Sequence, residues 1–268
     1  MLRLSALYRY PLKSGKAETL QQIGLDKLGL DGDRRWMLVD EASGRFLTQR
    51  AVAKMSQLSA LWNSSGGLTL SSPGYAPLDV ALPGSASELR GVTIWRDTLR
   101  VPDAGDEAAA WVSEFIGKPT RLVQLPLERA RTTEAGYGKD DDKVGFADGY
   151  PLLLIGQGSL DDLCTKIGRP MEMLRFRPNL VIEGAEAFAE DGWKRVRIGD
   201  VEFRVVKPCS RCILTTIDPQ TGERSPDREP FATLETYRKT EKGAMFGQNL
   251  VNDGIGRLEV GMPVTVLE

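Results

Sequence analysis

Residues Lys207–Gly222 read K-P-C-S-R-C-I-L-T-T-I-D-P-Q-T-G and place Cys209 and Cys212 three positions apart. Arg211 lies between the two cysteines, and a strand-like run, Ile213–Ile217, follows them. Cysteines at this spacing occur in zinc sites and in redox disulfides. A nucleophile, a ligand for another metal and a pair of buried small apolar residues are the alternatives. Because a neighbouring cation favours a thiolate, Cys212 is the stronger candidate for a nucleophile or a soft-metal ligand.

The residue counts of the whole chain exclude several of these chemistries. The 268 residues contain no histidine and only three cysteines. Without histidine, neither a Ser-His-Asp nor a Cys-His nucleophile arrangement is available. Three cysteines do not supply a four-cysteine zinc or iron–sulfur site. We interpret the third, Cys164, as a core residue, because it lies on an amphipathic stretch beside Leu163 and Ile167.

Charge and hydropathy indicate a globular protein without a bulk affinity for polyanions. The net charge is −2, and no apolar run approaches the roughly 18 residues of a membrane span. The N-terminal M-L-R-L-S-A-L-Y-R-Y-P lacks the apolar core and cleavage site of a signal peptide. We therefore expect no nucleic-acid polymer and no membrane as partners, and a cytoplasmic protein with reduced thiols.

The pattern of elements predicts a mainly β protein with a few helices, rich in β-barrel structure. Short strands at regular spacing fill the first hundred residues, among them Leu4–Tyr10 and Arg35–Asp40. Asp106–Ile116 has the spacing of an amphipathic helix. At this length we expect one large or two modest domains.

The second half mixes strands with one helix and a polar loop. Ser159–Ile167 is predicted to be a helix with Ser159 as its N-cap and two aspartates in its first turn. Arg177–Ile182 is predicted to be a strand, and Gly199-Asp200 the turn of a hairpin. Glu128–Lys143 has few apolar residues, and we expect it to be a mobile loop.

Basic and hydroxyl side chains cluster where predicted strands end. The clusters contain Lys13, Ser14, Arg34, Arg50, Arg177, Asn179 and Arg211. If the strand ends converge, these residues form a pocket suited to a phosphate or another anion. Asp148, at the return of a loop to an apolar strand, is either a turn residue or a carboxylate for proton transfer at the pocket edge.

Together, these motifs resemble a known family. K-P-C-S-R-C-I-L-T-T-I-D-P-Q-T-G, with F-R-P-N before it and M-F-G-Q-N after it, is similar to the MOSC domain. Y-P-L-K-S-G-K, G-D-R-R-W and L-T-Q-R resemble the β-barrel domain that precedes it. The resemblance covers nearly the whole chain and points to the YcbX-like proteins and the mitochondrial amidoxime-reducing components. It implies an N-terminal MOSC-associated β-barrel domain, residues 1–120, followed by a MOSC β-barrel domain, residues 121–268.

The resemblance also implies roles for particular residues. Its cofactor is molybdenum bound to molybdopterin, with Cys212 as the metal ligand and Cys209 close by but not a ligand. The cofactor-binding residues it implies are Lys13, Ser14, Arg34, Arg50, Arg177, Asn179 and Arg211. Asp148 matches an aspartate near the metal and, with water, is a candidate proton donor. Pyridoxal phosphate binding is a second cofactor class attributed to the family.

The function implied is an oxidoreductase that reduces N-hydroxylated bases and amidoximes. YcbX-like proteins often carry a ferredoxin-like domain with four cysteines, which a chain with three cysteines does not hold. We therefore expect a separate electron donor, ferredoxin-like or flavoprotein-like. The alternatives are a non-enzymatic carrier of the molybdenum cofactor or of sulfur, and a thiol redox protein built on the cysteine pair.

Overall fold

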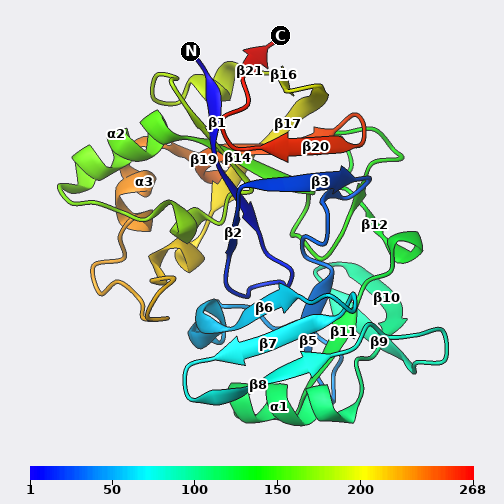
Figure 1. Ribbon diagram of the computed structural model, residues 1–268. Helices are drawn as coiled ribbons and strands as arrows, with labels where there is room; N and C mark the ends of the chain where they lie inside the picture. The colour runs from blue at the N-terminus through cyan, green and yellow to red at the C-terminus, as the bar shows by residue number, and fades with distance from the viewer.

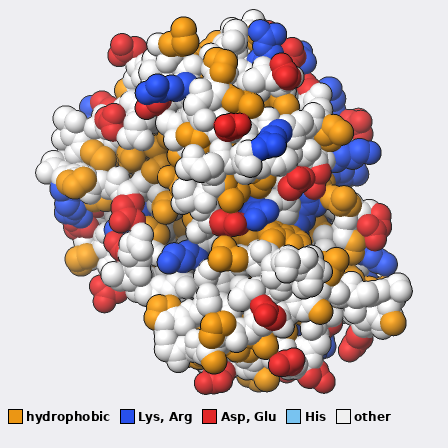
Figure 2. All heavy atoms as spheres, in the orientation of Figure 1, with side chains coloured by type: hydrophobic (Ala, Val, Ile, Leu, Met, Phe, Trp, Pro, Cys, Tyr) orange, Lys and Arg blue, Asp and Glu red, His pale blue; other side chains and the backbone are white.

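The computed structural model describes residues 1–268 and shows a mainly β protein with three α-helices, as expected from the sequence. Figure 1 shows two lobes, an upper one that holds both chain termini and a lower one that rests on α1. Figure 2 shows acidic and basic side chains interspersed over one face of the molecule. None of the helices is long and apolar enough to cross a membrane.

The upper lobe is organised by one nine-stranded sheet. Its strands are β1 (Arg3–Arg9), β2 (Glu18–Leu20), β14 (Leu152–Gly156), β15 (Leu180–Glu183), β16 (Arg195–Ile198), β17 (Val201–Arg211), β18 (Lys239–Thr240), β19 (Gly243–Asn252) and β21 (Val264–Val266). The path runs β2-β1-β15-β14-β19-β17-β16-β21, with β18 paired to β19. Backbone bonds from Leu4 to Met262 and from Val264 to Leu2 bring the two ends of this path together.

Alternating apolar residues fill the inside of this sheet. Leu4 and Leu7 of β1, Leu154 of β14 and Phe203 of β17 are fully buried in one cluster. The outer side is covered by α2 (Gln157–Ile167) and α3 (Phe231–Tyr237), where Leu163 and Leu234 enter a second cluster. Cys164 packs at the edge of that second cluster, as its interpretation as a core residue predicts.

The lower lobe consists of small sheets and one helix. The strands are β5 (Trp36–Asp40) with β11 (Thr120–Gln124), β6 (Ser59–Trp62) with β7 (Leu68–Ser72) and β8 (Tyr75–Val80), and β9 (Leu89–Ile94) with β10 (Asp97–Pro102). Helix α1 covers Asp106–Ile116, the range that the sequence predicts. It ends at Gly117 in the left-handed conformation, which glycine adopts without strain.

The remaining elements are short strands and 3-10 helices. The strands are β3 (Gln22–Asp26), β4 (Gly29–Leu30) and β20 (Gly256–Glu259), and the pair β12 (Arg131–Thr132) and β13 (Lys143–Val144). The 3-10 helices are η1 (Ala53–Gln57), η2 (Leu127–Arg129), η3 (Met173–Phe176), η4 (Ala189–Gly192) and η5 (Ile213–Thr216). The division at residue 120 stays a prediction, since β1 and β2 lie in a sheet otherwise formed by residues 152–266.

Three local predictions from the sequence were wrong. Ile213–Ile217 is not a strand, because η5 occupies Ile213–Thr216. The strand predicted from Arg177 begins only at Leu180, because the backbone of Arg177 has a left-handed conformation that does not fit the hydrogen-bonding pattern of a strand. Helix α2 begins at Gln157, without an acidic residue in its first turn, so Ser159 is not its N-cap.

Two buried polar contacts anchor helix α2 and the polar segment Glu128–Lys143. The hydroxyl of Ser159 donates to the fully buried carboxylate of Glu190, which also accepts a bond from the Gly156 amide. In the polar segment Glu128–Lys143, Asp142 is buried and pairs with Arg204 of β17 at 2.6 Å. Ion pairing therefore anchors this segment where apolar contacts are few.

Ser159→Ala is expected to lower the free energy of unfolding by about 2 kcal/mol, because the buried Glu190 carboxylate loses a donor. Urea denaturation of the variant beside the exposed Ser85→Ala control measures this difference. Equal stability of the two variants would contradict the assignment of this bond.

Candidate functional site: a cationic pocket between the lobes

One pocket collects every candidate site residue that the sequence predicts. It is lined by Lys13, Ser14, Arg34, Arg50, Ala147, Asp148, Gly149, Tyr150, Leu152, Leu153, Arg175, Phe176, Arg177, Asn179, Cys209, Ser210, Arg211, Cys212, Leu214, Thr215 and Asn249. Six of these residues are cationic and one, Asp148, is acidic. The lining residues come from both halves of the chain, so the pocket forms only when these segments have folded together.

Cys212 lies where β17 ends and η5 begins. A break in register between Pro208 and Ser210 marks a bulge in β17, a device that redirects side chains next to many active sites. The Sγ atom of Cys212 accepts a hydrogen bond from Nε of Arg50 at 3.3 Å. A half-buried sulfur beside a guanidinium is suited to act as a thiolate ligand.

Cys209 differs from Cys212 in its surroundings. It packs at the edge of the apolar cluster under α2 and α3. Burial raises the pKa of the Cys209 thiol, which keeps it protonated at neutral pH. The two cysteines therefore have unequal environments, although both line the pocket.

Asp148 accepts hydrogen bonds from three side chains at the pocket mouth. Lys13 and Trp95 donate to Oδ1, the latter at 3.2 Å, and Arg50 donates to Oδ2 at 3.4 Å. Desolvation by the surrounding pocket favours the neutral acid, but the charges of Lys13 and Arg50 outweigh it and hold the pKa of Asp148 well below its usual range. The carboxylate is therefore ionised at neutral pH, and its role as proton donor stays a prediction.

Lys13 is the most deeply buried of the pocket cations. Its Nζ donates to the carbonyl of Phe146 at 2.7 Å and to Asp148. Burial lowers the pKa of Lys13 to about 8, against the opposing attraction of Asp148. Its ammonium group thus holds a proton that leaves near physiological pH, which is rare for lysine.

Arg34 and Arg177 both pack against the ring of Tyr10. Their guanidinium carbons lie 4.1 and 4.2 Å from the ring centroid. Arg34 donates to Asn179 at 2.9 Å, and Arg177 donates to the carbonyl of Gly15 at 2.7 Å. Burial lowers the pKa of Arg177 to about 10. The side chain of Asn179 therefore orients Arg34 and forms its other hydrogen bonds with the backbone of Leu153 and Tyr8.

Backbone strain concentrates at this pocket. Ser14, Arg34 and Arg177 have φ angles of 61°, 47° and 55°, in the left-handed region that favours glycine. Each such residue costs on the order of 1–3 kcal/mol and persists where the surroundings enforce it. Outliers of this kind cluster at functional sites, and half of the six in this protein line the pocket.

Arg175 and Arg211 complete the cationic lining. Arg211 donates to the carbonyls of Phe246 and Phe176, and Arg175 to the carbonyl of Thr216 and to Asp218. Buried guanidinium nitrogens of Arg175, Arg177 and Arg211 have no hydrogen-bond partner in the protein. Unpartnered buried donors are costly, so the pocket is matched to an added group with acceptor atoms.

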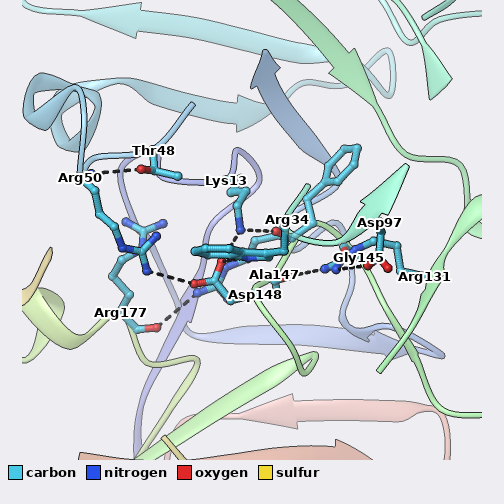
Figure 3. Close-up of polar contacts among 12 residues, drawn as sticks. Lys13, Arg34, Thr48, Arg50, Asp97, Arg131, Gly145, Ala147, Asp148 and Arg177 are labelled. Atoms are coloured by element: carbon cyan, nitrogen blue, oxygen red, sulfur yellow. Dashed lines mark hydrogen bonds and ion pairs between the residues drawn. The ribbon is translucent and has the colours of Figure 1, made fainter. Parts of the chain in front are cut away.

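Three residues at or behind the pocket were missed by the sequence reasoning. Arg175 stood in the same basic cluster as Arg177 and was passed over. Trp95 carried no signal. Arg131, behind the pocket, donates to the carbonyls of Gly145 and Ala147 and pairs with Asp97 at 2.8 Å, as Figure 3 shows. It thereby ties the loop that carries Asp148 to strand β10.

Anion binding is expected to weaken as the pH rises through about 8, because Lys13 is charged below that pH and neutral above it. Sulfate is a suitable probe, since its own charge is constant from about pH 6 to about pH 10, whereas lysine in peptides titrates near 10.4. Titration calorimetry should show that Lys13→Met binds sulfate about tenfold more weakly than the native protein does below pH 8. The affinity of the variant should not change as the pH rises through 8. The exposed Lys27→Met is the control, and a pH step retained in Lys13→Met would contradict the assignment.

Comparison with known proteins agrees with this geometry. Residues 1–119 match the MOSC N-terminal beta barrel domain, and residues 141–265 match the MOSC domain. The mitochondrial amidoxime-reducing component 1 of Danio rerio is 33% identical over 97% of this chain and 83% of its own length. Component 1 of Homo sapiens is 32% identical, over 98% and 82%, and component 2 of Rattus norvegicus 34%, over 97% and 82%. The chain therefore belongs to the MOSC-domain family that includes the mitochondrial amidoxime-reducing components.

Proposed function

We propose that this protein is a molybdenum-cofactor-dependent reductase of N-hydroxylated compounds such as N-hydroxylated bases and amidoximes. The observation that carries the proposal is the placement of Cys212 in a pocket lined by six cations and one carboxylate. A dianionic phosphate is bound well by guanidinium donors, and a soft metal is bound well by a thiolate. The pocket contains residues of both kinds. Relatives named for amidoxime reduction, 32–34% identical over most of the chain, support the same activity.

The residues divide into those that hold the cofactor and those that manage charge. Arg34, Arg177 and Arg211, with Lys13 and Ser14, would bind its anionic part, and Cys212 would ligate the metal. The donor set fits, because Arg177 and Arg211, together with Arg175 in the same lining, retain buried unpartnered nitrogens. When bound, the molybdenum supplies the two electrons that cleave the N–O bond of the substrate.

The remaining residues act around the reacting group. Arg50 donates to the sulfur of Cys212, and hydrogen bonds to a ligand sulfur tune a metal's potential. Cleaving an N–OH bond to an N–H product and water consumes two electrons and two protons. The Nζ atom of Lys13 carries a proton with a pKa of about 8 and donates a hydrogen bond to Asp148. We assign proton supply to Lys13 and to bound water, with the ionised Asp148 orienting the Lys13 ammonium group by accepting its hydrogen bond.

The electrons come, in this proposal, from a separate ferredoxin-like or flavoprotein-like donor. The cytoplasmic location and the binding of pyridoxal phosphate stay predictions.

Cys212→Ala is expected to abolish molybdenum retention, because it removes the one thiolate ligand, whereas Cys209→Ala should retain the metal. Protein expressed in a molybdenum-replete host and measured by elemental analysis gives the answer. Similar metal content in the two variants would reject the ligand assignment.

Activity separates the reductase from a cofactor carrier. Metal-loaded protein with an artificial electron donor is expected to reduce a hydroxylamino-purine, and Cys212→Ala should lose at least about a thousandfold of that rate. Full metal loading without any reduction would favour the carrier.

A further inference from the structure

Trp95 is an unusual residue for a hairpin tip. It follows β9 and, with Arg96, makes the two-residue turn into β10. Its φ angle is 53°, in a region that bulky residues rarely adopt and where such turns usually place glycine or asparagine. The residue is 45% exposed, although burial is the usual gain from a large aromatic ring. The strained backbone of Trp95 therefore costs free energy that is not offset by burial of its ring in a core.

The indole of Trp95 lies against the charged mouth of the pocket. Its Nε1 donates to Asp148 at 3.2 Å, and the guanidinium of Arg50 sits 5.1 Å from its ring centroid. Phe46 packs against it at 5.0 Å with a tilt of 58°. Arg50 in turn contacts Cys212, so the exposed indole is two contacts away from the proposed metal ligand.

Three features of this arrangement suit a flat conjugated molecule. The indole is held in place by Phe46 and Arg50, so an aromatic ligand meets a rigid surface. Stacked aromatic pairs gain energy beyond the area they bury. Asp148, whose side chain is 54% exposed, lies beside the ring and offers carboxylate oxygens to N–H donors such as those of an amidine.

We propose that Trp95 is a specificity-determining residue that stacks on substrates whose N-hydroxylated group belongs to a planar conjugated system. This inference rests on the proposed reductase function and narrows its substrate class. Aromatic amidoximes and N-hydroxylated heterocyclic bases are favoured over aliphatic amidoximes that carry the same reacting group.

Steady-state kinetics with an aromatic and an aliphatic amidoxime test the proposal on cofactor-loaded protein. Trp95→Leu should raise KM for the aromatic substrate about tenfold, with kcat and the aliphatic KM unchanged within about twofold. Trp95→Phe keeps an aromatic face but loses the N–H donor, and should stay within about twofold of the native KM. Trp111→Leu, a tryptophan that contacts Tyr75 and Phe115 in the lower lobe, is the matched control.

The pattern across the variants decides between stacking and support of Asp148. Equal losses in Trp95→Phe and Trp95→Leu would overturn stacking and assign the effect to the lost hydrogen bond. Equal losses for the two substrates would also overturn it, because a structural defect does not distinguish them. Thermal unfolding of each variant identifies any that fail to fold.

A binding measurement keeps the inference separate from the proposed activity. Titration calorimetry with an aromatic amidine, the reduced product class, should show about tenfold tighter binding than with an aliphatic amidine, and Trp95→Leu should remove the difference. If the native protein reduces neither amidoxime, the reductase proposal fails. The calorimetric comparison of the two amidines still tests the role of Trp95 in that case. Equal binding of the two amidines by the native protein would overturn the inference.

Discussion

Six positive charges must be held close together around one pocket, and much of the site's architecture answers that constraint. Arg211 is neutralised by no carboxylate and rests on two backbone carbonyls and the Phe176 ring. Arg177 uses a carbonyl and the Tyr10 ring in the same way. Carbonyl dipoles and ring faces hold these two guanidinium groups without cancelling their charge, so Arg177 and Arg211 stay available for an anion. The other four cations pair with carboxylates: Lys13 and Arg50 with Asp148, Arg34 with Asp33 and Arg175 with Asp218.

The same constraint explains why the pocket lies between two lobes. Lys13, Arg34 and Arg50 come from the first fifty residues, whereas Arg175, Arg177, Arg211 and Cys212 come from segments beyond residue 145. Figure 1 places these segments where the upper and lower lobes meet, and Figure 3 shows Lys13, Arg50, Asp148 and Arg177 reaching that region from different elements. Spreading the cations over several strand ends limits their mutual repulsion until the lobes have packed.

The placement of the candidate residues was accessible from the sequence because they lie in short motifs at strand ends. Strand periodicity located most of these ends, although the strands predicted at Arg177 and after Cys212 were wrong, and the nine candidates do line one pocket. Residues whose importance comes from a distant partner were not accessible. Arg131 matters because the carbonyl of Ala147 lies beside it, and Trp95 because it defies the usual turn chemistry. Ser159 was misassigned because a distant Glu190 competes for its hydroxyl.

The left-handed residues Ser14, Arg34 and Arg177 place this protein under opposing selections. Glycine at any of them would relieve strain and raise stability, but glycine carries no hydroxyl or guanidinium. A laboratory population selected only for heat resistance would therefore lose these side chains early. Phe188 and Arg228 share this backbone conformation outside the pocket. Glycine at those two positions would relieve strain without removing a pocket side chain, so only the losses at Ser14, Arg34 and Arg177 would affect the site.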